Sequence, residues 1–125
     1  METARVLVCV TRQKTCERLI RSGAKISREM GLELSVVHVV PTGSNFLGNP
    51  HEGEALEYLF SISKEHGADM SVLKADQVVD TLVTYAQDNA AAVIVMGDAP
   101  GGGSAIVREL HRRLRDVDFR ILPAR

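Results

Sequence analysis

The sequence alternates short, β-branched apolar runs with longer segments of helical periodicity. Five strands are predicted by the runs "RVLVCV" (5–10), "LELSVVHVV" (32–40), "DMSVLK" (69–74), "AAVIVMG" (91–97) and "DFRILP" (118–123). Runs that stay apolar without alternation are typical of strands that are buried on both faces of a parallel sheet. Strands that alternate with helices therefore predict an α/β fold, with a doubly wound, five-stranded parallel sheet and helices on both faces.

Four segments between these runs repeat their apolar side chains at helical spacing. The expected buried faces are, in chain order, Leu19, Ile20, Gly23, Ala24, Ser27 and Met30; Ala55, Leu56, Leu59 and Ile62; Val79, Leu82, Val83 and Ala86; Ile106, Val107, Leu110 and Leu114. Asn49 is the predicted cap of the second helix, with Pro50 at its first position, and Asp76 is the predicted cap of the third. Gly31 and Gly67 are expected to end the first two helices.

The composition describes one ordinary globular domain, predicted to span residues 1–125. The formal net charge is −1 and 45% of the residues are hydrophobic, so nothing in the charge favours nucleic acid or an anionic membrane as a partner. No signal peptide is recognised and no apolar run approaches the length of a membrane span. The two cysteines do not make a disulfide framework, so a cytoplasmic setting is expected. The initial methionine favours a complete small protein over an excised sensor domain.

Two loops carry the chemistry that a ligand would use. In a doubly wound sheet, ligands bind where the strand order reverses, at the carboxyl ends of the strands. If the first and fourth strands are neighbours there, "TRQKT" (11–15) faces "GDAPGGGS" (97–104). Backbone N–H groups of the three glycines, the Ser104 hydroxyl and the positive end of the following helix would suit phosphate, with Arg12 and Lys14 adding charge. The alternative is a flexible link, because no Walker or dinucleotide fingerprint is present.

The remaining reactive side chains have structural interpretations. His38, within "VVHVV", is expected to be a hydrogen-bonded histidine of the interior, and Cys9 a small core residue. Cys16 begins a helix, where a redox role is the alternative to a structural one. We find no nucleophile with a base, no paired carboxylates near the loops and no metal-ligand spacing among the histidines. The sequence therefore predicts a protein without catalytic or metal-binding residues.

Several segments, taken in order, resemble the universal stress protein family. They are "VLVCVT", "TCERLIRSGAKIS", "LSVVHVV", "ADQVVDTLVTYAQDNAAAVIVMG" and a glycine-serine helix start. Within that family the sequence most closely resembles the form found in the cytoplasmic part of potassium-sensing KdpD histidine kinases. The resemblance implies the strand order 3-2-1-4-5 and homodimers that pair their last strands.

The same resemblance implies a binding site for ATP or another adenine nucleotide, with magnesium. Nucleotide-binding members use an aspartate at the end of the first strand, where this chain has Thr11, and a valine that corresponds to Val39. Their glycine loop is shorter here, and Pro100 stands at its second glycine position, one place before Gly101. The implied binding residues are Thr11, Val39, Gly97, Gly101, Gly103 and Ser104. Cys9, near the end of the first strand, is predicted to belong to the same site. Thr11 carries no charge and the short loop offers fewer N–H groups, so binding is expected to be weak.

Three functions are therefore compared. The first is a non-catalytic stress-response or regulatory module that binds an adenine nucleotide weakly. The second is a ligand-free dimeric interaction or signalling module, similar to the KdpD sensor domain. The third is a nucleotide hydrolase, which the missing catalytic constellation argues against.

Overall fold

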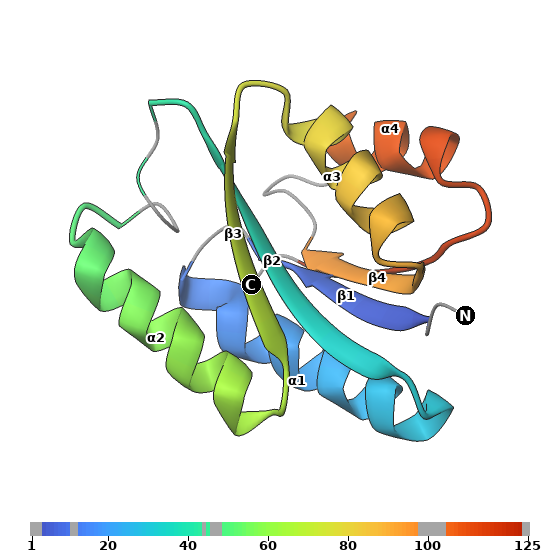
Figure 1. Cartoon of the computed structure of the whole chain (residues 1–125), viewed down its shortest axis with the longest axis horizontal. Helices are drawn as coiled ribbons and strands as arrows, with labels where there is room; N and C mark the ends of the chain where they lie inside the picture. Colours follow the sequence, from blue (N-terminus) through green and yellow to red (C-terminus); the bar gives the residue numbers. More distant parts are fainter. Residues whose placement is uncertain (1–3, 11–12, 44, 46–48, 98–104, 124–125) are drawn as a thin grey trace.

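The computed structural model of the chain describes residues 4–10, 13–43, 45, 49–97 and 105–123. Strands and helices alternate along these residues (Figure 1). The elements are β1 (Arg5–Cys9), α1 (Gln13–Met30), β2 (Glu33–Pro41), α2 (Glu52–Glu65), β3 (Asp69–Ala75), α3 (Val78–Asp88), β4 (Ala91–Gly97), α4 (Ala105–Arg113) and β5 (Asp118–Leu122).

The described strands form a parallel sheet with the order β3-β2-β1-β4-β5. β1 is the central strand: Val8 lies opposite Val36 on one side and Val95 on the other. After β3 the chain crosses back over the sheet and places β4 beside β1. This arrangement confirms the predicted α/β, doubly wound class and the strand order that the family resemblance implied.

The helices cover the sheet on both faces, α1 and α2 on one and α3 and α4 on the other (Figure 1). Successive side chains of a strand point to opposite faces of the sheet, so alternate residues of each strand belong to two separate hydrophobic cores. Val6, Val8 and Val10 of the first run pack with α1 and α2, whereas Leu7 and Cys9 pack with α3 and α4. The unbroken apolar runs of the sequence thus reflect burial on both faces.

α1 approaches the sheet closely at one point. A Cβ atom added to Gly23 would lie 2.3 Å from Cγ2 of Val8 and 3.2 Å from Cδ1 of Leu34. Only glycine fits this contact, which explains its place on the buried face of a helix. Gly31 ends α1 with a φ of 68°, the left-handed conformation in which glycine is favoured, as predicted.

The predicted helix starts were less accurate. α1 begins at Gln13, so the polar turn expected over 11–15 is shorter than predicted. α2 begins at Glu52 with His51 as the residue before it; the Asn49 side chain instead accepts a hydrogen bond from the His51 backbone N–H, at 2.9 Å. Gln77, not Asp76, precedes α3, and neither it nor His51 makes a capping side-chain bond. A polar residue near a helix start therefore did not identify the cap.

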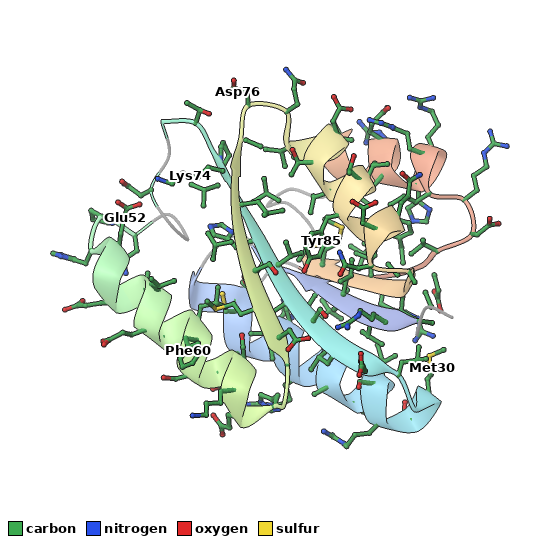
Figure 2. All side chains as sticks on the ribbon, viewed as in Figure 1. Met30, Glu52, Phe60, Lys74, Asp76 and Tyr85 are labelled. Carbon is green, nitrogen blue, oxygen red and sulfur yellow. The ribbon has the colours of Figure 1, made fainter. Side chains whose placement is uncertain are left out.

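Three residues predicted to be buried are exposed instead. Met30 is 51% exposed at the end of α1, Leu56 45% on α2 and Ile106 42% on α4 (Figure 2 labels Met30). Leu56 lies one residue beyond the stripe of Ala55 and Leu59 that contacts the sheet, so the stripe is narrower than the apolar pattern. No described helix has the length and apolarity that a membrane crossing requires.

Candidate functional site

The strand order reverses between β1 and β4, and the candidate site lies at their carboxyl ends. β1 ends at Cys9 and β4 at Gly97, while β2 continues to Pro41. The Val10 backbone N–H donates a hydrogen bond to the Val37 carbonyl at 3.0 Å and extends the pairing by one residue. In doubly wound sheets ligands bind at this edge, which is where the sequence analysis places the candidate site.

The structure describes some of the predicted site residues and not others. Cys9, Val39 and Gly97 belong to the three central strands and meet at this edge. The other predicted residues lie outside the described ones: Thr11, Gly101, Gly103 and Ser104, together with Arg12. The described part of the site thus consists of the strand ends and the helices that follow them.

Cys9 and Val39 make an apolar floor on the α3–α4 side of the sheet. Cys9 is 5% exposed and lies between Val37 and Met96 in register, and Val39 is 7% exposed. A Cβ atom added to Gly97 would meet only the Leu19 side chain, at 3.8 Å, which is an ordinary contact. Packing against the described residues therefore does not require glycine at position 97.

The two helices that follow β1 and β4 begin beside the same edge. Neither α1 nor α4 has an acidic residue in its first turn. By contrast, α2 has Glu52 and Glu54 there and α3 has Asp80. The N-terminal end of a helix carries about half a positive charge, which carboxylates normally offset. Within the described residues, no carboxylate of their own first turns offsets the positive ends of α1 and α4, an arrangement suited to an anion. This contrast was not predicted, although it can be read in the first turns themselves.

His38 ties the end of β1 to β2. Its side chain is buried, and Nδ1 lies 2.7 Å from the Val10 carbonyl oxygen. A carbonyl can only accept, so Nδ1 carries the proton and donates it. Burial lowers the pKa of His38, and the bond to Val10 opposes that shift. The predicted hydrogen-bonded, interior histidine is confirmed, and it holds the residue that precedes the first loop.

The two cysteines are buried on opposite faces of the sheet and are not bonded to each other. Burial raises the pKa of both thiols to about 12. At Cys16 this effect outweighs the helix start, which would favour a thiolate. The structural interpretation of Cys16 is therefore the one that its surroundings support. Among the described residues, no group of three or more histidine, cysteine or acidic side chains is placed to hold a metal ion.

Solved structures share this fold. The universal stress protein from Archaeoglobus fulgidus matches with a TM-score of 0.69 and 22% identity, over 100% of this chain and 96% of that one. A structure from the same organism in complex with dAMP matches with a TM-score of 0.65 and 22% identity, over the whole of both chains. A universal stress protein in complex with cAMP gives 0.57 and 16%, over 99% of this chain and 98% of that one.

These identities are low, so the structural likeness supports the fold alone. A comparison with curated proteins gives no match. The model of the Universal stress protein family, however, matches residues 2–108, which is most of the chain. This match shows that the chain belongs to the universal stress protein family, whose implied strand order the structure has.

Proposed function

We propose that this protein is a non-catalytic regulatory module of the stress-response type, which binds an adenine nucleotide at the edge between β1 and β4. The observation that carries the proposal is the pair of helix starts at this edge. α1 and α4 lack acidic residues in their first turns, so their positive ends remain available to phosphate. This charge distribution favours a phosphorylated ligand over a neutral one.

The base is assigned to adenine on two grounds. Two of the similar universal stress proteins were solved in complex with dAMP and with cAMP. In this chain, the side chains of Val39 and Cys9 at the strand ends are apolar and almost completely buried, 7% and 5% exposed, so the small part that reaches the candidate site suits a flat base better than a charged group. Magnesium would accompany a triphosphate, and no described acidic group marks a place for it on the protein.

The affinity is expected to be modest. Thr11 stands where the family resemblance implies an aspartate, and the glycine loop between Gly97 and Ser104 is short. Each missing polar contact reduces the binding free energy by about 1–3 kcal/mol. Two such losses, about 2–6 kcal/mol together, would weaken binding by about thirtyfold or more. Dissociation constants in the range of cellular nucleotide concentrations fit a sensor better than a permanently loaded protein.

Thermal unfolding tests the proposal. The melting temperature is measured with adenosine, AMP, cAMP and ATP, with and without magnesium. A ligand at about a hundred times its dissociation constant stabilises the folded state by about 2.7 kcal/mol. We expect the phosphorylated ligands to raise the melting temperature and adenosine to raise it less, because adenosine offers no charge to the helix ends.

Two variants and one assay separate the alternatives. Gly103→Val and Ser104→Ala should reduce the nucleotide-induced shift, whereas Gly53→Ala, on α2, should leave it intact. An unchanged melting temperature with every nucleotide would contradict the proposal and favour the ligand-free interaction module. Release of phosphate from ATP that depends on Ser104 would identify a hydrolase instead.

The second candidate, a KdpD-like interaction module, is favoured by the outer edge of β5. This strand pairs with β4 and, among the described residues, with no other strand. Phe119, Ile121 and Leu122 are only partly buried along it. A homodimer through β5 would cover them. Sedimentation over a range of concentrations tests this arrangement, and a monomer at every concentration would contradict it.

A further inference from the structure

The outer edge of β3, at the other end of the sheet, is open. β3 pairs with β2 and with no other described strand, and none of its seven residues is fully buried. An edge strand leaves alternate backbone N–H and C=O groups unpaired, and proteins usually protect such edges with charges, prolines or bulges. The middle of this strand, from Met70 to Leu73, has no charged residue and no proline. Within the described part of the chain, no strand pairs with its outer backbone groups, which suit the addition of a further strand.

A groove lies along α3 and reaches β3 at Leu73. It has a volume of about 390 Å³, with Leu73 of β3 on one side; α3 lines the rest with Asp80, Thr81, Thr84, Tyr85 and Asp88. The Tyr85 hydroxyl group lies 3.0 Å from Ser71 Oγ and links the helix to the strand (Figure 2 labels Tyr85). The groove thus places Leu73, the Tyr85 ring and hydroxyl groups next to the strand whose outer edge is open.

Two carboxylates line the groove, and only one of them has a cationic partner among the described residues. Asp80 forms an ion pair with Arg113 of α4, so its charge is offset. Asp88 has no ion pair or hydrogen bond with any described residue, and α3 has no basic residue in its last turn. Its carboxylate therefore adds to the negative end of the helix dipole, where a cation is normally favoured.

The remaining charges near β3 do not change this balance. Asp76 follows the strand and is exposed at its carboxyl end (Figure 2). Lys74 is also exposed, but it follows Leu73 directly and so points to the opposite face of the strand. At the amino end, Asp69 is paired with Arg5. Among the described residues, Asp88 thus leaves uncompensated negative charge in the groove, and Asp76, which does not line it, adds negative charge after β3.

We propose that β3 and α3 form a docking site for an extended, basic segment of a partner protein, which adds a strand to the sheet. Asp80 and Asp88 are eight residues apart on α3, which corresponds to about 12 Å along the helix. In an extended strand, side chains four residues apart are separated by about 13 Å and lie on the same face. Because only Asp88 lacks a cationic partner, the matching segment has a lysine or arginine opposite Asp88 and an apolar residue two positions away, over Leu73. A second basic residue, four positions from the first, would share Asp80 with Arg113. The site is separate from the nucleotide edge and does not depend on it.

A labelled peptide tests the site by fluorescence anisotropy. The probe repeats Lys-Thr-Val-Thr over about nine residues, so that lysines and valines alternate on one face. Its first comparison is the same peptide with N-methylated backbone amides, which keeps the charge but cannot pair with a strand. We expect the unmodified peptide to bind and the N-methylated one to lose most of the affinity. Asp88→Asn should weaken binding about two- to fivefold, the range for an exposed ion pair. Glu57→Gln, on the exposed side of α2, is the matched control and should bind as the unchanged chain does.

Three results would overturn the proposal. The first is an absence of binding, and the second is equal binding of the N-methylated peptide, which would reveal attraction by charge alone. The third is a dimer, in the absence of peptide, that Thr84→Arg dissociates, since the edge would then hold a second copy of this chain. Circular dichroism and melting of each variant establish that it is folded before binding is measured.

Discussion

Gly23 sets the distance between α1 and the sheet. Gly23→Ala would place a methyl group 2.3 Å from Val8 Cγ2, so the helix or the strand must move. We expect the substitution to destabilise the protein by about 1–3 kcal/mol, the usual range for overpacking a core. Denaturant unfolding measures this as a lower midpoint.

The same substitution at Gly53 is the control. Gly53 lies within α2, and an added Cβ would meet nothing within 4 Å. Gly53→Ala should therefore raise stability by about 0.5 kcal/mol, because alanine is the better helix former. If both variants shift the midpoint in the same direction, the close approach of α1 to β1 is not what selects glycine at position 23.

His38 makes stability depend on pH. Burial lowers its pKa in the folded protein below the ordinary value of 6.5. Below that pH the unfolded chain binds a proton that the folded protein does not, so stability falls as the pH decreases, by about 1.4 kcal/mol per pH unit at most. His38→Gln, which cannot titrate, should show a shallower decline in denaturant unfolding between mildly acidic and neutral pH. Equal slopes would show that His38 does not contribute, since His51, His66 and His111 are present in both proteins.

At the scale of elements, the four described helices differ in the charge of their first turns. α2 and α3 begin with carboxylates that stabilise their own N-terminal ends, whereas α1 and α4 do not. Ile106→Glu adds a carboxylate to the first turn of α4, at an exposed position. We expect it to stabilise the protein by about 0.3–1 kcal/mol and at the same time to weaken nucleotide binding, because it competes with phosphate.

The opposite signs of these two effects make the test specific. Leu56→Glu, at an exposed position on α2, is the control and should leave the nucleotide-induced shift in melting temperature unchanged. If Ile106→Glu leaves that shift intact, the N-terminal end of α4 takes no part in binding.

At the scale of the whole molecule, the sequence was most informative where burial is two-sided. "VLVCV" and "AAVIVMG" are apolar at every position because α1 and α2 cover one set of side chains and α3 and α4 the other. The strand boundaries and the alternation with helices follow from that pattern. The order of the strands does not follow from that pattern. The residues predicted only a doubly wound sheet, and the family resemblance supplied the order 3-2-1-4-5.

Other features were beyond prediction because they depend on contacts that are distant in sequence. The pattern of α2 contains Leu56, but the sheet reaches only to the stripe of Ala55 and Leu59. Likewise, "VVHVV" predicts a buried histidine without indicating that its partner is the carbonyl of Val10, on another strand. At the candidate site, the strand ends could be located from the sequence. The roles of Thr11, Gly101, Gly103 and Ser104 remain predictions.

The central position of β1 has a consequence for synthesis. β1 leaves the ribosome before the other described strands, yet its partner on one side is β4, with Val6 opposite Val93. Until β4 emerges, β1, β2 and β3 can assemble with α1 and α2 on one face, while on the other face α3 has been made but α4, which follows β4, has not. Such contacts between distant segments slow folding and expose apolar surface meanwhile. The nascent chain is therefore most vulnerable to aggregation until β4 and α4 are made.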